Sequence, residues 1–363
     1  MSDRLVIGID ARAAAEVPAG RGRYVRELLA ALARRDDVCR YLLYARSRWD
    51  GALDERFDWR LIDARDPVWH LRAALAANRE ATVFLSTNSY LTAWFTRIPC
   101  AVVVYDLITF KPEARPQKRA ALIEKATARL AVHRAGALLC ISEWTRADLV
   151  QRFPAAARKA VAIPLAASEP PDVDAEAAVA AVGLDRAYVL AVGTLEPRKN
   201  LGRLVAAWSM LPGELRASRT LALVGPKGWE LDEVLGPVKA AEDDVRLLGF
   251  VSDEELAALY ARCELFAYPS LYEGFGLPVL EAMQAGAAVV TSRTSSLPEV
   301  GGDAVAYVDP LDVRDIAAAL ERLLRDPDER ERLGRAAAER AHRFSWGETA
   351  RMTYEKLAGL WLV

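Results

Sequence analysis

Short apolar runs alternate with longer stretches of helical periodicity along most of the chain. Four early runs are unbroken and rich in β-branched residues, as strands buried on both faces are: RLVIGID, TVFLS, CAVVVYD and ALLCIS. Helical patterns lie between or after them, in GRYVRELLAALARR, RPQKRAALIEKATARLAVHRA and SEWTRADLVQRF. Alternation of this kind predicts a parallel sheet with right-handed crossovers.

A stretch rich in proline and acids, AASEPPDVDAEAA, then interrupts the pattern and predicts a linker. Strand-like runs resume with YVLAVG, LALVG, VRLLG, LFAYPS, AAVVTS and VAYVD, separated by helical patterns such as SDEELAALYARC and DVRDIAAALERLLRD. We therefore predict two doubly wound α/β domains, over residues 1–170 and 171–345. A last helical stretch over 346–363 is expected to pack back onto the first domain. Ligands bind at the carboxyl ends of strands in such sheets, so we expect the site in the cleft between the domains.

The charge of the chain is nearly balanced overall but unevenly spread. The net charge of −2 over 363 residues gives no indication of a nucleic-acid partner. Residues 1–170 hold 27 basic and 19 acidic side chains, whereas residues 171–363 hold 21 and 31. The excess is greatest over Lys111–Arg134, with seven bases against two acids. This stretch is either a solvated helix face or a surface that meets anionic lipid or an anionic acceptor.

The cysteines and the apolar runs indicate the compartment. Four cysteines lie far apart with no C-x-x-C motif, which predicts buried thiols in a reducing compartment. The first residues resemble a core strand rather than a signal peptide, and the apolar runs are of strand length. We therefore expect a cytoplasmic protein, with peripheral contact at the inner membrane leaflet left open by the basic stretch.

The stretch EGFGLPVLEAM places two carboxylates, Glu273 and Glu281, around a glycine turn. Pro278 suits the first turn of a helix, and Gly274 and Gly276 precede it. Backbone N–H groups at a helix start form an anion site that glycines leave open, while carboxylates accept hydrogen bonds from vicinal hydroxyls. The stretch indicates a ligand with both phosphate and sugar hydroxyls; an ordinary loop before a helix is the alternative.

A second candidate, GTLEPRKN, follows a predicted strand. Arg198 and Lys199 stand at its carboxyl end, before a helix that Asn200 is placed to cap. Adjacent bases there fit a diphosphate, Arg as a fork and Lys as a point charge; a charged surface turn is the alternative.

A third candidate, PAGRGRYVRELL, places Gly20 and Gly22 between the first strand and a helix. A lone G-x-G is a weak signal. Val25 stands where the dinucleotide fingerprint has its third glycine, so we do not predict NAD binding.

Taken together, these motifs resemble one known family over nearly the whole chain. They are GIDAR, GRGRYVRELL, YDLITFKPE, CISEWTRADL, EPRKN, LGFVSDEELAALY, YPSLYEGFGLPVLEAM, SSLPEVGGDAVAYVDP and FSW. The chain resembles the retaining glycosyltransferases of family 4, in particular their mannosyltransferase-like members. The resemblance implies the GT-B fold of two Rossmann-like domains that face a cleft.

The resemblance also implies roles for individual residues. Arg198 and Lys199 would hold the donor diphosphate and neutralise the leaving group, and Glu273 would lie beside the transferred sugar. Many members carry His-Asp where this chain has Tyr105 and Asp106, and that departure puts one sugar contact in doubt. The remaining donor-binding positions implied are Gly20, Gly22, Phe250, Val251, Gly274, Phe275, Gly276, Leu277 and Glu281, with Glu281 on the ribose and Phe250 and Val251 flanking the base.

Neither a metal nor a cofactor is expected. Members of the family typically work without a bound metal, and the two acid pairs of the chain support this. Asp172–Asp174 lies in the predicted linker and Asp326–Asp328 in a turn before a helix, so neither follows an apolar strand. The three histidines, His70, His133 and His342, fall outside the motifs and are expected to be structural or exposed.

The function implied is retaining sugar transfer from a nucleoside-diphosphate sugar, with GDP-mannose the favoured donor, to a glycan or lipid-linked glycan acceptor in polysaccharide biosynthesis. With no nucleophile–base pair evident, catalysis would consist of positioning and of stabilising the departing diphosphate, as in a front-face substitution. Two alternatives stay open: a GT-B-shaped sugar-nucleotide epimerase or hydrolase, and a non-catalytic nucleotide-binding pseudo-transferase.

Overall fold

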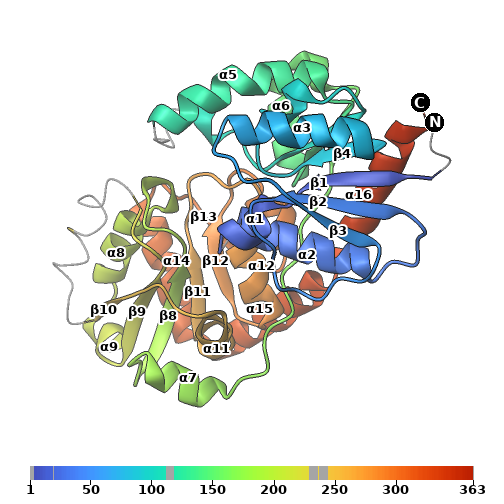
Figure 1. Ribbon diagram of the computed structural model, residues 1–363. Coiled ribbons are helices and arrows are strands. Elements are labelled where there is room, and N and C mark those ends of the chain that lie inside the picture. Colours follow the sequence, from blue (N-terminus) through green and yellow to red (C-terminus); the bar gives the residue numbers. More distant parts are fainter. Residues whose placement is uncertain (1–3, 19, 112–117, 229–235, 237–243, 363) are drawn as a thin grey trace. The chain divides into compact units, whose positions relative to one another are not determined.

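The structure is a computed structural model that describes residues 4–18, 20–111, 118–228, 236 and 244–362, with the backbone alone for 118–124 (Figure 1). Its internal contacts divide the chain into two units. Unit 1 takes the first part of the chain as far as Ala166 together with Ser345–Val363, and unit 2 runs from Ala167 to Phe344. The division thus falls at Ala166, whereas the sequence placed it after residue 170.

Unit 1 is built on a seven-stranded sheet whose strands all pair in parallel, in the order β3-β2-β1-β4-β5-β6-β7. The strands are β1 (Val6–Asp10), β2 (Arg40–Ala45), β3 (Phe57–Leu61), β4 (Val83–Ser86), β5 (Cys100–Val104), β6 (Ala137–Cys140) and β7 (Ala160–Ala162). The four apolar runs of the first half are β1, β4, β5 and β6. The sequence missed β2, β3 and β7, because FDWRL in β3 is only partly apolar and β7 has three residues.

Helices cover both faces of this sheet (Figure 1). On one face α2 (Arg21–Ala33) packs against α16 (Trp346–Trp361), which also contacts β4, β5 and β6; the short α1 (Arg12–Glu16) contacts α2. On the other face α3 (Val68–Glu80) contacts α4 (Thr92–Phe95), which in turn contacts α5 (Lys118–Arg134). The remaining elements are α6 (Glu143–Arg152) and the 3-10 turns η1 (Ile108–Phe110) and η3 (Pro154–Ala156).

Unit 2 repeats the architecture with six parallel strands in the order β10-β9-β8-β11-β12-β13. The strands are β8 (Ala187–Val192), β9 (Arg219–Val224), β10 (Val245–Gly249), β11 (Leu265–Tyr268), β12 (Val289–Ser292) and β13 (Ala306–Val308). Its helical elements are α7 (Ala175–Ala181), η4 (Pro197–Lys199), α8 (Leu201–Ser209), α9 (Gly213–Ala217), α11 (Asp253–Arg262), α12 (Leu277–Gln284), α13 (Leu297–Gly301), α14 (Val313–Arg325) and α15 (Pro327–Ala341). The fold prediction of two doubly wound parallel-sheet domains is confirmed.

One helix, α7, begins inside the stretch that the sequence analysis treated as a linker. The carboxylate of Asp174 accepts hydrogen bonds from the backbone N–H groups of Glu176 and Ala177, both at 3.1 Å. This N-cap satisfies donors that the first helical turn leaves unpaired. The run of alanines that follows has high helix propensity, so the helix starts once the prolines have passed.

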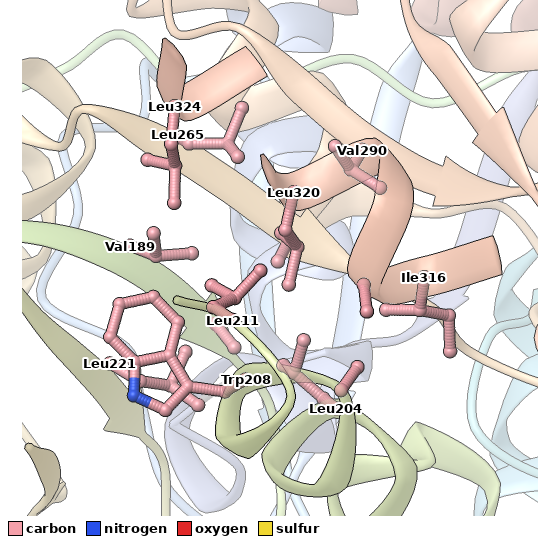
Figure 2. Close-up of a cluster of buried hydrophobic side chains, with 14 of the residues drawn as sticks. Val189, Leu204, Trp208, Leu211, Leu221, Leu265, Val290, Ile316, Leu320 and Leu324 are labelled. Carbon is pink, nitrogen blue, oxygen red and sulfur yellow. The ribbon is translucent and has the colours of Figure 1, made fainter. Parts of the chain in front are cut away.

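The core of unit 2 fills the space between the sheet and helices α8 and α14 (Figure 2). Trp208 of α8 and Ile316 and Leu320 of α14 are fully buried there against strand residues such as Val189 and Leu265. The positions 316, 320 and 324 lie on one face of α14, as apolar residues four apart do. This packing holds β8 and β11 side by side and fixes where their carboxyl ends emerge.

Both sheets contain a point at which the strand order reverses. It falls between β1 and β4 in unit 1 and between β8 and β11 in unit 2. In open parallel sheets the connections from two such neighbours leave on opposite faces, and the crevice at their carboxyl ends is the usual ligand site. The two strongest motifs of the sequence, GTLEPRKN and EGFGLPVLEAM, follow β8 and β11.

Candidate functional site

The loop after β8 carries the two basic residues of GTLEPRKN. Gly193 (φ 149°) leaves the strand, and a Cβ at this position would lie 3.1 Å from Cε of Lys199. Asn200 adopts a left-handed conformation (φ 61°) at the start of α8, and the expected side-chain cap is absent. Its amide instead donates to the carbonyls of Pro269, at 2.9 Å, and Pro310, at 2.6 Å. Asn200 therefore fastens this loop to the loop after β11.

Four charged side chains from the two loops form one cluster. Arg198 Nη1 lies 2.6 Å from Glu273 Oε2, and Lys199 Nζ lies 2.7 Å from Glu273 Oε1. On its other edge Arg198 Nε lies 2.5 Å from Glu196 Oε1. Glu196, Glu273 and Lys199 are 3%, 7% and 8% exposed, whereas the Arg198 side chain is 21% exposed. Arg198 is thus the member of the cluster that solvent reaches most readily.

Glu273 receives further hydrogen bonds from its own loop. The hydroxyls of Tyr268 and Ser270 donate to its Oε1 at 2.8 and 2.7 Å. Lys199 Nζ also donates to the Tyr268 hydroxyl. Both carboxylate oxygens therefore accept from protein groups in this structure, and the expected contact of Glu273 with a transferred sugar stays a prediction.

Burial and charge act in opposite directions on this cluster. Burial raises the pKa of Glu273, but the charges of Arg198 and Lys199 and the hydrogen bonds outweigh it and lower that pKa to about 2. Burial lowers the pKa of Lys199 and the charge of Arg198 lowers it further, while Glu273 and Glu196 act in the opposite direction without reversing the net lowering. Burial raises the pKa of Tyr268 well above its ordinary value, so its hydroxyl remains a donor to Glu273.

The start of α12 is shaped by glycine and by two serines of the loop after β12. Gly276 is the N-cap residue, with φ 109° and no side-chain cap. Ser295, itself at φ 52°, accepts a hydrogen bond from the N–H of Glu273 at 2.9 Å. Ser296 donates to the carbonyls of Glu273 and Phe275 at 3.0 and 2.8 Å. The loop is therefore held rigidly at a helix N-terminus, whose dipole favours an anion.

The second glutamate of the E-x7-E motif contacts the neighbouring helix α11. Glu281, in α12, accepts a hydrogen bond at 2.9 Å from the hydroxyl of Tyr260 in α11. Phe250 and Val251 follow β10, which β9 separates from β8, so they stand apart from the charge cluster. Phe250 is 70% exposed and Val251 is 9% exposed. An exposed aromatic ring at a strand end is available for stacking, as the prediction for the base requires.

In unit 1 the structure places two sequence candidates, Tyr105 and the turn of Gly20, close to each other. The Tyr105 ring, after β5, packs edge-on against Tyr24 of α2 at 5.4 Å between ring centroids. The Arg21 guanidinium lies 5.2 Å from the centre of the Tyr105 ring. Among the described residues the buried Tyr105 hydroxyl has no hydrogen-bond partner. The turn that carries Gly20 is thereby placed beside the end of β5.

The two glycines of this turn differ in their surroundings. Gly20 has φ 54° and open space where a Cβ would stand. A Cβ on Gly22 would lie 1.7 Å from the carbonyl oxygen of Val17, so packing within the chain explains this glycine. Asp106 accepts a hydrogen bond from the N–H of Ile108 at 3.0 Å and so shapes the turn after β5.

The described residues contain no group of three or more His, Cys, Asp or Glu side chains arranged to hold a metal ion. Asp174 and Asp326, from the two acid pairs noted in the sequence, are N-caps of α7 and α15. His70 is buried, with Nδ1 2.7 Å from the Thr92 hydroxyl, while His133 and His342 are exposed. Cys39, Cys100 and Cys140 are buried free thiols and Cys263 is half-buried.

Sequence reasoning missed the groups that hold the site together. Tyr268 and Ser270 stand in the quoted AYPS segment, and Glu196 stands beside the bases in LEPRKN. The available signal for the first two was a polar group at the end of a buried strand, since Tyr268 is the last residue of β11 and Ser270 stands two positions after it. Ser295 and Ser296 gave no local signal, because their partners lie some twenty positions away.

The sequence matches known proteins along most of its length. The family model of the group 1 glycosyl transferases matches residues 172–340, which contain the charge cluster. The O-antigen chain mannosyltransferase B of Escherichia coli is 36% identical over 296 residues, 79% of this chain and 76% of that protein. The MMP alpha-(1->4)-mannosyltransferase of Mycolicibacterium hassiacum is 34% identical over 227 residues, 60% of this chain and 54% of that protein.

Solved structures show the same architecture at lower identity. The sucrose-phosphate synthase of Thermosynechococcus elongatus superposes with a TM-score of 0.81 at 22% identity, covering 99% of this chain and 100% of the other. HepE of Anabaena, solved in complex with UDP and glucose, gives a TM-score of 0.76 at 19% identity and covers 98% and 99%. These likenesses show the GT-B fold. With the identity to the E. coli mannosyltransferase, they establish that the chain belongs to the group 1 glycosyl transferases.

Proposed function

We propose that this glycosyltransferase transfers mannose, with retention of configuration, from GDP-mannose to a glycan or lipid-linked glycan in polysaccharide biosynthesis. The observation that carries the proposal is the pairing of Arg198 and Lys199 with Glu273 at the switch point of unit 2. Similarity to two mannosyltransferases supports the sugar. The HepE complex shows that a protein of this fold binds UDP, which makes the base the first point to test.

The proposed donor site is built mainly on unit 2, and the donor contacts implied for Gly20 and Gly22 of unit 1 stay predictions. The diphosphate meets the exposed part of Arg198, with Lys199 behind it, and the N-terminus of α12 supplies backbone N–H groups and a favourable dipole. Glu281, partly buried in α12, accepts from the ribose hydroxyls, and Phe250 stacks on the base. The site thus combines cationic, carboxylate and aromatic side chains, which match the diphosphate, the ribose and the base of a nucleotide sugar.

Catalysis in this proposal consists of positioning and charge stabilisation. The bond from the anomeric carbon to the diphosphate breaks, and the departing oxygen gains negative charge beside Arg198 and Lys199. The same diphosphate accepts the proton of the acceptor hydroxyl. The acceptor oxygen meanwhile bonds to the anomeric carbon on the face from which the diphosphate departs. Pre-oriented charges act without reorganising, so this is where the protein lowers the barrier.

The donor is tested by thermal shift with GDP, UDP, GDP-mannose and UDP-glucose, followed by transfer assays on mannose-containing glycans. A ligand that binds the native state raises its stability by RT ln(1 + [L]/Kd), so one at 100 times its Kd adds about 2.7 kcal/mol. We expect GDP and GDP-mannose to give the largest shifts. Release of free mannose without an acceptor requirement would indicate a hydrolase, and donor binding without turnover would indicate a pseudo-transferase.

The proposed enzyme works without a metal ion, because Arg198 and Lys199 supply the positive charge. Turnover should therefore continue after treatment with EDTA. Recovery of a chelator-inactivated enzyme by Mg²⁺ or Mn²⁺ would contradict this assignment of the phosphate site.

The proposal places the enzyme in the cytoplasm, with the α3–α4–α5 layer of unit 1 in contact with an anionic membrane. Lys125 and Arg129 are exposed on α5, whereas the side chains of Lys118 and Arg119 lie outside the described residues. On α3, which contacts α4 as α5 does, Val68, Leu71 and Leu75 are 49%, 40% and 45% exposed and form one helical stripe. Exposed bases and an exposed aliphatic stripe in one helical layer suit an anionic lipid surface. The part of the chain that the structure describes has no helix of the length and apolarity needed to cross a membrane.

A further inference from the structure

Glu196 is the buried first residue of the EPRKN motif, and the proposed chemistry gives it no role. It is 3% exposed, although it stands in a loop where an acid beside two bases is usually solvated. Its Oε1 lies 2.5 Å from Nε of Arg198, the edge of the guanidinium opposite the one that Glu273 contacts. Arg198 therefore forms ion pairs with Glu196 at Nε and with Glu273 at Nη1.

A contribution to stability only weakly explains why two carboxylates contact Arg198. Burying two acids and two bases has a large desolvation penalty, and apolar residues of similar volume often serve a core as well. Glu273 is shared between Arg198 and Lys199, and Glu196 is the second carboxylate that Arg198 contacts. The second fixes the rotation of the guanidinium plane, because two carboxylates on different edges of a planar fork allow one orientation.

The backbone of the loop supports the same arrangement. Glu196 is the residue before the η4 turn, and its carbonyl accepts a hydrogen bond from the N–H of Lys199 at 3.0 Å. The Arg198 carbonyl accepts from the N–H of Leu271 at 2.8 Å and from the Ser270 hydroxyl at 3.0 Å. Both the main chain and the side chain of Arg198 are thus held, while 21% of its side chain stays exposed.

We propose that Glu196 is a positioning residue, which holds the exposed edge of Arg198 in the orientation that the leaving diphosphate needs. The inference rests on the proposed function, since it assigns that ligand to Arg198. Glu196 does not touch the donor; it acts through Arg198. Without it the guanidinium rotates toward Glu273 and pairs with both of its oxygens, so that its charge remains nearby but points away from the diphosphate.

Three substitutions separate orientation from charge. Glu196→Gln keeps an acceptor oxygen within reach of Arg198 Nε but removes the charge. Glu196→Asp keeps the charge but withdraws the acceptor by one methylene. Glu196→Ala removes both. If orientation matters, kcat of Glu196→Ala and Glu196→Asp falls roughly 100-fold, the size of effect that a misplaced group produces, while Glu196→Gln stays within about 3-fold of the wild type, since it keeps an oxygen beside Arg198 Nε.

Donor binding gives the second readout. We expect the donor KM to change by less than about 3-fold in all three variants, because a rotated Arg198 still supplies charge to the ground state. In Glu196→Gln and Glu196→Ala the cluster gains one net positive charge, so inhibition by GDP should become stronger, within the same limit of about 3-fold. A purely structural role would lower kcat and the folded fraction together. The kcat of Glu196→Gln would then be no higher than that of Glu196→Ala.

The matched control is Glu264→Ala. Glu264 also bridges two arginines of unit 2, with 2.7 Å to Arg219 and 2.7 Å to Arg330, but it lies outside the proposed site. The Glu264→Ala variant should be less stable than the wild type and should retain its kcat. Wild-type kcat in Glu196→Ala, or equal losses in Glu196→Ala and Glu196→Gln, would overturn the positioning role alone. Absence of sugar transfer by the wild-type protein would overturn the proposed function instead.

Discussion

Single residues in this protein owe their properties to partners that are distant in sequence. Glu273 shows this most clearly. Its carboxylate is buried, yet its pKa falls to about 2 because Arg198 and Lys199 from another loop face it. Lys199 shows the reverse, with a pKa lowered by burial despite its acidic partner. The charge of each group at neutral pH is therefore a property of the cluster.

The cluster predicts a specific pH dependence of stability. The pKa of Glu273 is lowered on folding from an ordinary value of 4.5, so its contribution is present above pH 4.5 and is lost as the pH falls toward 2. A shift of this size corresponds to about 3 kcal/mol. Urea unfolding between pH 7 and pH 2 should show this loss in the wild type and a flatter dependence in Glu273→Gln.

At pH 7 Glu273→Gln should itself be destabilised by roughly 3–5 kcal/mol, since it leaves two buried bases without their shared partner. Glu331→Gln removes one partner of an exposed pair with Arg335 and should stay within about 0.5 kcal/mol of the wild type. Equal stability of Glu273→Gln and Glu331→Gln would contradict the buried ion-pair description.

At the scale of elements, function depends on where a helix starts and on which face it exposes. Helix α12 begins after a glycine in a left-handed conformation, and the loop before it holds Glu273. Helices α3 and α5 each keep a stripe of exposed side chains on one face of the unit 1 sheet. Both features follow from local sequence, but the contribution of each to function depends on the elements packed beside it.

Replacement of Gly276 tests the start of α12. Gly276→Ala puts a Cβ on a residue with φ 109°, 2.9 Å from Cδ2 of the buried Leu297. Strain and overlap should cost about 1–3 kcal/mol, seen as a lower Tm, and the GDP-induced thermal shift should shrink because the loop moves. Gly359→Ala, in α16 with open space and an ordinary helical φ, should be neutral or stabilising by about 0.5–1 kcal/mol. Similar effects at the two sites would rule out a special role for Gly276.

Charge reversal tests the proposed membrane face. Lys125→Glu with Arg129→Glu should weaken binding to vesicles of phosphatidylglycerol and phosphatidylcholine by roughly 30-fold or more at low salt, at about 1 kcal/mol for each lost base. The effect should shrink as salt screens the charges. Arg332→Glu with Arg335→Glu, exposed in unit 2, is the control and should bind as the wild type does.

The apolar stripe of α3 contributes separately to this face. Leu71→Ser with Leu75→Ser should remove the binding that persists at high salt, since apolar burial is not screened. If wild-type protein ignores these vesicles at low ionic strength, the basic surface is only a solvated helix face and the acceptor is soluble.

At the scale of the whole molecule, the chain returns to unit 1 at its end. Helix α16 packs on α2 and on β4, β5 and β6, although some 180 residues of unit 2 precede it. Its side chains include the buried Trp346, whose ring lies 6.0 Å from that of Tyr24, and the fully buried Leu357. Helix α16 therefore contributes to the core of the first unit.

Hydrogen exchange can test whether the units are separate in stability. Leu357→Ala should cost about 2–5 kcal/mol in unit 1 and speed exchange in α2 more than in β8. Leu320→Ala, at an equally buried site in unit 2, should do the opposite. Equal acceleration in both units by either variant would show that the two cores unfold together.

Several features could be predicted from the sequence because their determinants are local. Buried parallel strands are continuous apolar runs, so β1, β4, β5, β6 and all six strands of unit 2 were found. The E-x7-E and E-P-R-K-N motifs indicated the family and the loops that carry the site. Glycines, prolines and caps act over a few positions, and a single sequence records them directly.

Only the tertiary structure decided which groups meet. Pairing of Glu273 with Arg198 and Lys199 joins residues about 75 positions apart, and it depends on β8 and β11 being neighbours in the sheet. The same holds for Asn200, whose amide ties two loops instead of capping a helix, and for β2 and β3, which are strands because β2 pairs with β1 and β3 pairs with β2. Hydrogen bonding and ion pairing act over a few ångströms in space, so distance along the chain carries no record of them.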